Sequence, residues 1–293
     1  MSKRLFITCR KLIICAFLFS LVSCYGSWNF MYEGNSVDER TKEMKMISDE
    51  SDLEFAHSEV SKLGGKYTVL VISDTHFGNK KKTVNEKKLY SWLEAKKGTP
   101  DYPSFAISLG DSTDLGRLDH FDKYLDFCKT LHESYNIPLV FNSCGNHDAY
   151  QNNWENWERA CYPHTSFYHF QTKGFSWYCL DTASGTVGQK QYKKLMAAFE
   201  IDSRPKIIFT HYPFVRFNIN CSNMAETTER NLMISDFYKN NVRCLLGGHN
   251  HTKTYDNLGF NDYGIPSFAY TEDWGLLYVD EDAGTAELEF IGG

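Results

Sequence analysis

Short clusters of histidine, aspartate and asparagine recur along the chain, and each one follows an apolar run. The clusters are Asp74-Thr75-His76, Gly110-Asp111, Gly145-Asn146-His147-Asp148, His211 and Gly248-His249-Asn250-His251. Carboxylates combined with imidazoles suit divalent Mn, Fe, Ni or Zn, whereas Ca and Mg prefer shells of oxygen ligands. An isolated histidine is more often a core residue than a ligand. Because the clusters recur in the same setting, however, they predict one metal centre built from several loops.

The apolar runs before the clusters predict the strands that position them, over 67–73, 104–109, 137–143, 205–210 and 242–246. Helices are expected over 84–97, 117–134, 188–200 and 224–240, aromatic strands over 166–171 and 174–180, and short strands with little helix after 251. Alternating strands and helices favour an α/β fold, in which the carboxyl ends of parallel strands meet at one edge of the sheet.

The motifs D-x-H, G-D, G-N-H-D, H and G-H-x-H occur in this order from Asp74 to His251. In this respect the chain resembles the calcineurin-like metallophosphoesterase superfamily. The resemblance implies a four-layer α-β-β-α sandwich with two mixed β-sheets, formed by a domain over 66–293. Purple acid phosphatases carry a tyrosine ligand where this chain has Asp114, which argues against that branch.

The resemblance also implies two metal sites that share one carboxylate. The first would comprise Asp74, His76, Asp111 and His251, and the second would comprise Asp111, Asn146, His211 and His249. Asp111 would bridge the two ions. His147 would face the substrate phosphate, where it would stabilise charge or protonate the leaving alkoxide, and Asp148 would fix the tautomer of His147 or its loop. His147 and Asp148 are therefore the candidate catalytic residues.

A dinuclear site of this kind implies hydrolysis of a small phosphoester by attack of a metal-bridging hydroxide, with the metals also binding phosphate oxygens. The motifs resemble phosphodiesterase-leaning bacterial branches, so we expect a phosphodiester or pyrophosphate substrate. Two alternatives remain. One is a phosphomonoesterase with the same site, and the other is an inactive tethered binding protein, which is less favoured because every ligand position and His147 are filled.

The N-terminal residues resemble an export signal. Four cations and no acids precede an apolar run over 12–22, which is short for a membrane span. Leu21-Val22-Ser23-Cys24 looks like a bacterial lipobox, which predicts cleavage after residue 23 and a lipid on Cys24. The alternatives are an ordinary signal cut after Ser23 or Ser27, or an uncleaved anchor. A polar tether over 24–65 would then hold the domain at the cell envelope, with the outer membrane or cell surface favoured.

The net charge bears on nucleic-acid binding, and the positions of the cysteines bear on the core and on disulfides. The formal charge is −6, and because residues 1–23 carry four of the 31 cations and no acids, it becomes 27 − 37 = −10 without them. Sequence-independent nucleic-acid binding, which needs a basic surface, is not expected. The thiols of Cys128, Cys179 and Cys244 lie in apolar runs and are expected in the core. A disulfide between Cys161 and Cys221 remains open.

Overall fold

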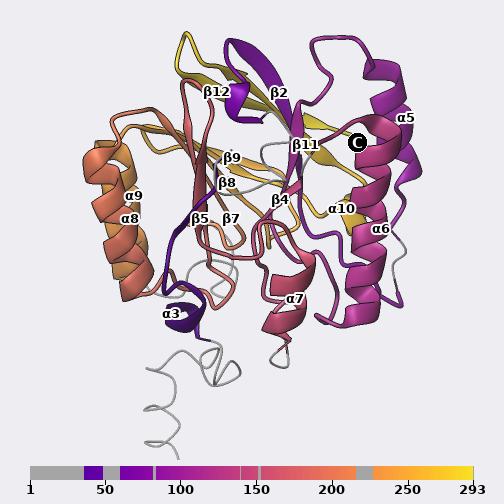
Figure 1. The fold of residues 1–293 in the computed structure, drawn as a ribbon, viewed down its shortest axis with the longest axis horizontal. Helices are drawn as coiled ribbons and strands as arrows, with labels where there is room; N and C mark the ends of the chain where they lie inside the picture. Colours follow the sequence, from indigo (N-terminus) through magenta and orange to yellow (C-terminus); the bar gives the residue numbers. More distant parts are fainter. Residues whose placement is uncertain are drawn as a thin grey trace, which may run out of the picture.

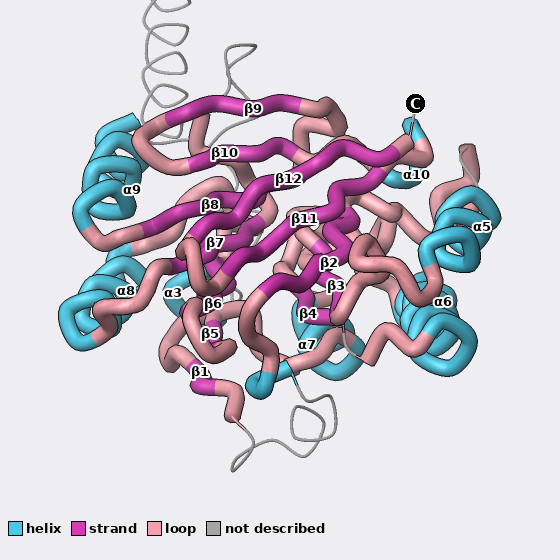
Figure 2. Tube along the Cα trace, turned by 90° about the horizontal axis from the view of Figure 1, so that it is seen from above, coloured by secondary structure: helices cyan, strands magenta, loops and turns pink. Residues whose placement is uncertain are grey.

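The computed structural model describes residues 36–48, 60–81, 84–138, 140–150, 153–215 and 227–292. Within these residues, two β-sheets lie face to face and helices cover both outer surfaces (Figure 1). Viewed from above, α5 and α6 flank one sheet and α8 and α9 flank the other (Figure 2). The expected α-β-β-α sandwich with two mixed sheets is confirmed.

The larger sheet has the strand order β1-β5-β6-β7-β8-β10-β9. Its strands are β1 (Lys45–Met46), β5 (Tyr168–Gln171), β6 (Ser176–Leu180), β7 (Lys206–Thr210), β8 (Val242–Gly247), β9 (Thr254–Asn257) and β10 (Asn261–Gly264). Strands β6, β7, β8 and β10 are parallel, whereas the β5–β6 and β9–β10 pairs are antiparallel. The parallel strands β7 and β8 deliver His211 and the His249–His251 loop to the same edge.

The smaller sheet has the order β12-β11-β2-β3-β4. It consists of β2 (Lys66–Ile72), β3 (Phe105–Ser108), β4 (Val140–Asn142), β11 (Trp274–Asp280) and β12 (Thr285–Ile291). Strands β2, β3 and β4 run parallel, and β11 pairs antiparallel with both β2 and β12. The loops after β2, β3 and β4 therefore also meet at one edge.

Seven helical segments of at least four residues connect the described strands. They are α3 (Val37–Arg40), α5 (Lys87–Lys96), α6 (Leu118–Tyr135), α7 (Trp154–Ala160), α8 (Gln189–Ile201), α9 (Thr227–Lys239) and α10 (Phe268–Thr271), and a 3₁₀ turn spans Val60–Lys62. In α6 the buried side chains of Phe121, Tyr124 and Leu131 recur at helical spacing and face the smaller sheet. That helix ends at Asn136, which adopts a left-handed conformation.

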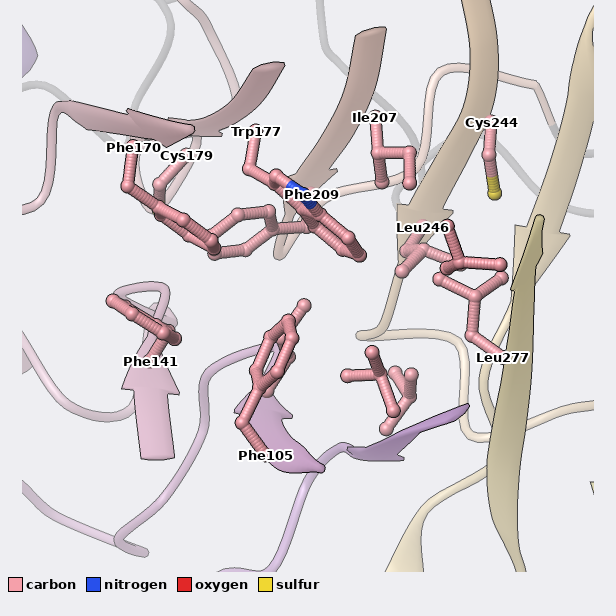
Figure 3. Packing of buried hydrophobic residues seen from close by; sticks show 14 of the residues in the cluster. Phe105, Phe141, Phe170, Trp177, Cys179, Ile207, Phe209, Cys244, Leu246 and Leu277 are labelled. Atoms are coloured by element: carbon pink, nitrogen blue, oxygen red, sulfur yellow. The ribbon is translucent and has the colours of Figure 1, made fainter. Parts of the chain in front are cut away.

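The core between the sheets is largely aromatic. Phe105 and Phe141 from the smaller sheet face Phe170 and Trp177 from the larger one (Figure 3). The rings of Phe141 and Phe170 stack with centroids 4.1 Å apart, and Phe105 meets Trp177 edge-on at 5.3 Å. Buried aromatic pairs contribute about 0.5–1.5 kcal/mol beyond the area they bury. This core fixes the two sheets, and hence their loops, relative to each other.

The sequence prediction missed α7. No helix or strand was predicted over 154–160, but Trp154 and Trp157 lie on one face of this helix, stacked with ring centroids 5.0 Å apart. Both are buried, as is Phe214, so these three residues belong to the core. Tryptophan favours strands on average, and here burial against α6 and its neighbours outweighs that preference.

Part of the expected tether belongs to the fold, which corrects the predicted boundary. Strand β1 pairs in parallel with β5, and the guanidinium of Arg40 forms a buried ion pair with Asp181 at 2.7 Å. We call residues 36–48 the N-terminal arm. Cys24 and the rest of the export signal lie outside the described residues, as does Cys221. Among the described helices, none has the length and apolar character needed to cross a membrane.

Candidate metal centre

Loops at the carboxyl ends of β2, β3, β4, β7 and β8 converge at one edge of the two sheets. Hydrogen bonds tie the first two loops together, since the amides of Asp74 and His76 donate to the carbonyls of Gly110 and Asp111 at 3.0 and 2.9 Å. These loops carry left-handed residues that are not glycine: Asp74, His76, Asp111, His249 and His251, with φ between 45° and 65°. Such strain costs roughly 1 kcal/mol or more per residue and is typical of functional sites.

Two glycines allow the β3 and β4 loops to touch. Gly110 has φ 92°, and a Cβ atom there would lie 2.6 Å from the backbone nitrogen of Gly145. A Cβ on Gly145 would in turn lie 2.1 Å from the nitrogen of Asp111. Neither position accepts a side chain without moving backbone. The close approach places Asp111 beside Asn146 and His147.

The first group of ligand candidates comprises Asp74, His76 and His251, whose ligand atoms lie within 4.8 Å of one another. The Nε2 atoms of the two imidazoles are 3.3 Å apart. Asp74 Oδ1 lies 3.2 Å from His251 Nε2 and 3.9 Å from His76 Nε2. The other carboxylate oxygen, Oδ2, accepts hydrogen bonds from the Ser73 hydroxyl and from the His249 amide.

The second group comprises Asp111, His211 and His249, again within 4.8 Å. His211 Nε2 lies 3.4 Å from Asp111 Oδ2 and 3.1 Å from the side-chain oxygen of Asn146. The opposite ring nitrogen, Nδ1, donates to the carbonyl of Leu109 at 2.8 Å. This bond fixes the ring so that Nε2 faces the cluster, an arrangement common to metal-binding histidines.

Asp111 lies between the two groups. Its Oδ2 is 3.4 Å from His211 Nε2 in the second group and 3.9 Å from His76 Nε2 in the first. Its Oδ1 accepts a hydrogen bond from the His147 amide at 2.8 Å. The seven predicted ligands thus lie together, and Asp111, which the resemblance implies is shared, lies between the two groups.

The cluster suits cations. Asp74 Oδ1 is buried and, although it lies 3.2 Å from His251 Nε2, it accepts no well-aligned hydrogen bond, which a buried carboxylate oxygen normally does. Burial alone would raise the pKa of Asp111, but the neighbouring His211 charge holds it well below its usual range. The same pairing, working against burial, raises the pKa of His211 to about 9, whereas burial and the His211 charge lower the pKa of His249 to about 4. Divalent ions would satisfy these converging oxygens and nitrogens.

His147 faces the same space from the β4 loop. Its Nδ1 donates to the carbonyl of Asp114 at 2.7 Å, which leaves Nε2 on the side of the metal candidates. The ring meets that of His76 edge-on, with centroids 4.8 Å apart. His147 is half-buried, so it can reach a bound ligand.

Asp148 has the second of its two predicted roles. It is fully buried and accepts backbone hydrogen bonds from Ser112, Thr113 and Gly145 at 2.9–3.2 Å. These bonds tie the β3 loop to the β4 loop. The Asp114 carbonyl, not Asp148, fixes the tautomer of His147, so Asp148 is a positioning residue and its assignment as catalytic is corrected.

Three tyrosines at the centre were not singled out as catalytic or ligand residues. Tyr150 accepts from the Asn146 amide at 3.3 Å, and its hydroxyl lies 3.5 Å from His147 Nε2. Tyr212 stacks on His249 with ring centroids 3.8 Å apart, and the partly exposed Tyr270 stacks on His251 at 5.1 Å. Tyr212 and Tyr270 belong to aromatic stretches of the sequence, which is a weak signal for a role at the site. Tyr150 lies outside every motif, so the sequence gives no signal for it.

A family model for calcineurin-like phosphoesterases matches residues 67–253, well over half of the chain. The chain belongs to this family. Members of the family use a dinuclear divalent metal centre, and the two groups around Asp111 are plausible ligands for it. No curated protein matches the chain significantly in sequence.

Two solved structures show the fold of the family at low sequence identity. A dimetal phosphatase from Danio rerio has a TM-score of 0.60 and 16% identity, over 77% of this chain and 96% of that one. A Plasmodium protein described as the anchor in the inner membrane complex has a TM-score of 0.55 and 10% identity, over 78% of this chain and 85% of that one. Both likenesses extend across most of the described residues.

Proposed function

We propose that this protein is a phosphohydrolase that uses two divalent metal ions, Mn, Fe, Ni or Zn, to cleave a phosphodiester or pyrophosphate bond. The observation that carries the proposal is the position of Asp111 Oδ2, within 3.9 Å of imidazoles from both ligand groups. One carboxylate between two such groups suits a pair of metals roughly 3.5–4 Å apart.

Each part of the cluster has a role in this reaction. Asp74, His76 and His251 would hold one ion and Asn146, His211 and His249 the other, with Asp111 shared. When bound, the ions would supply a nucleophilic water near neutral pH and neutralise charge on the phosphate. In its imidazolium form, with both ring nitrogens protonated, His147 would donate from Nε2 a hydrogen bond to a phosphate oxygen or a proton to the leaving oxygen. The fixed Nδ1–H bond to Asp114 keeps that nitrogen aimed at the substrate.

The surroundings of the cluster favour a diester over a monoester. Tyr150, Tyr212 and Tyr270 contact the ligand candidates or His147 and supply phenol groups without a positive charge. A diester carries one negative charge and two organic substituents, which suits uncharged aromatic neighbours. A dianionic monoester gains more from lysine or arginine.

The test is hydrolysis of bis-p-nitrophenyl phosphate beside p-nitrophenyl phosphate by the chain from residue 25 onward, reconstituted with Mn. This chain contains every described element of the fold. We expect two bound metals and preference for the diester. Asp111→Asn should lose metal and at least about 10²-fold in rate, whereas the control Asp122→Asn, an exposed residue of α6, should lose neither.

Other outcomes would change the assignment in defined ways. Preference for the monoester would replace the diester with a phosphomonoesterase. Two bound metals without turnover of either substrate would contradict the hydrolase proposal for these chemical classes and favour a binding protein. Absence of metal from the unmodified chain would contradict the dinuclear centre itself.

We also propose that the protein is exported and held at a bacterial envelope by a lipid on Cys24, with the outer membrane or cell surface favoured. The support is the motif Leu21-Val22-Ser23-Cys24 after a basic and apolar leader. Labelling cells with a palmitate analogue tests this directly. The label should appear in the unmodified chain and disappear in Cys24→Ser, whereas Cys15→Ser, within the leader, should keep it.

A further inference from the structure

A cavity lies far from the metal centre, between α8 and the outer face of the larger sheet. Its volume is about 660 Å³, within the range of small-molecule sites. Arg204, which lines it, precedes β7, whereas His211 follows that strand. At the rise of an extended chain, the two residues are roughly 20 Å apart. This cavity is therefore separate from the predicted active site.

The floor of the cavity is a cross-strand row on β1, β5 and β6. Met46 pairs with His169, which in turn pairs with Tyr178, so all three side chains lie on one face. The rings of His169 and Tyr178 stack with centroids 5.3 Å apart. Ala198 and Ile201 of α8 form the apolar wall, and Ile201 is 90% exposed. One side of the cavity is therefore suited to an aliphatic group.

Most charges around the cavity are already paired. Lys194 contacts Glu43 at 2.9 Å. Asp202 accepts from the Tyr178 hydroxyl at 2.8 Å and from the Arg204 amide at 3.1 Å. The carboxylates of Glu43 and Asp202 thus have partners from within the described chain, and the guanidinium of Arg204 is the cation that these contacts do not neutralise.

Two nitrogen atoms at the cavity lack partners. Arg204 Nη1 and His169 Nδ1 are shielded from solvent, and neither has a hydrogen-bond partner among the described residues. A buried donor without an acceptor costs about 1–3 kcal/mol, and more when it is charged. A ligand oxygen in the cavity would remove this cost by accepting from Arg204 Nη1 and, in the tautomer that carries its proton on Nδ1, from His169.

We propose that this cavity binds a small amphipathic carboxylate, with its headgroup on Arg204 and His169 and its aliphatic part against Met46 and Ile201. A guanidinium and a carboxylate form strong charge-assisted hydrogen bonds. Burial lowers the pKa of His169, with Asp202 opposing it, so the imidazole is neutral near pH 7. One unneutralised cation therefore matches a monoanion better than a phosphate dianion. The proposal does not depend on the hydrolase activity.

Calorimetric titration with octanoate, octanol and octylammonium tests the proposal, using the chain from residue 25 onward. Octanoate should bind saturably at one site. Arg204→Met, which keeps the aliphatic volume, should weaken binding roughly tenfold or more, because a charge-assisted bond is lost. The matched control Arg117→Met removes an exposed guanidinium elsewhere and should leave the affinity unchanged.

A second variant guards against misfolding of Arg204→Met. Ala197 lines the cavity but is exposed, so Ala197→Trp should fill it without overpacking the core and should abolish octanoate binding. Absence of octanoate binding would overturn the proposal. It would also fail if octanol or octylammonium bound equally well, or if both variants bound octanoate like the unmodified chain.

Discussion

The buried ion pair between Arg40 and Asp181 should be among the most sensitive points of the fold. The guanidinium makes two bonds to the carboxylate, at 2.7 and 2.8 Å, and the two side chains are 1% and 0% exposed. Removing one partner of such a pair strands the other charge in the interior, which typically costs about 3–5 kcal/mol. Asp181 would keep the Ser166 hydroxyl and the Ala183 amide as donors, so we expect Arg40→Met to lose about 3 kcal/mol, at the lower end of that range.

The assay is urea unfolding of the chain from residue 25 onward. Lys194→Met is a matched control, because Lys194 also joins the arm to the domain through Glu43, but these side chains are 37% and 88% exposed. An exposed pair contributes less than about 1 kcal/mol. The double variant Arg40→Met with Asp181→Leu should regain part of the lost stability, since it removes the stranded carboxylate. A loss in Arg40→Met no larger than in Lys194→Met would refute the reasoning.

The same variant should disturb the metal centre. Next to Asp181, the Thr182 hydroxyl accepts a bond from the Tyr212 amide at 2.7 Å, and Tyr212 stacks on His249. The guanidinium also lies 5.5 Å from the ring centre of Trp154, which follows the His147 loop. Arg40→Met should therefore lower metal content measured under native conditions. Full occupancy in a destabilised variant would limit Arg40 to a role in stability.

Four further predictions concern single residues. His147→Ala should lower the rate of diester hydrolysis about 10²-fold or more while two metals stay bound, as element analysis would show; loss of metal would instead make His147 a ligand. Tyr150→Phe should lower turnover with unchanged metal content, because it removes the hydroxyl beside His147 Nε2. Turnover equal to that of the unmodified chain would show that the hydroxyl does not contribute to catalysis. Gly110→Ala should cost at least about 2 kcal/mol in urea unfolding, from its positive φ and the clash with Gly145, whereas Gly98→Ala, with positive φ but open space, should cost less. His169 has a lowered pKa in the fold, so the unfolded chain binds the proton more readily, and the free energy of unfolding should fall as pH drops through about 6.5. His169→Gln should flatten the dependence of this free energy on pH in that range. An unchanged slope would contradict the assignment of the pH dependence to His169.

Local patterns in the sequence were sufficient to locate the metal centre. Asp74, Asp111 and His211 each follow a largely apolar strand, and the parallel strands of each sheet place their carboxyl ends at one edge. The order of the motifs carried the resemblance to the family, and that resemblance implied the two-sheet sandwich and a shared role for Asp111. These features depend on short stretches of chain, which is why they could be predicted without coordinates.

Other features depend on contacts between distant residues and could not be found in this way. Asp148 lies beside His147 in sequence, yet its carboxylate turns away from the site to accept amides of the β3 loop, a choice that only the fold determines. Tyr150 reaches the cluster because the chain turns sharply after Asn146. The helix over 154–160 is short, so burial of its two tryptophans outweighs local preference.

The N-terminal arm illustrates the same limit at the scale of the domain. Its charged residues and weak apolar periodicity are typical of a solvated tether, and Arg40 in particular resembles a surface cation. Its partner is 141 residues away, and a parallel pairing of only two residues places β1 beside β5. If the arm leads to a membrane anchor, the anchor is connected to Arg40, which contacts Asp181 after β6 and Trp154 after β4. Tension or displacement at the anchor would then act first on Asp181 and Tyr212, so metal occupancy should respond to loss of the arm more strongly than to shortening of residues 25–35, which precede it.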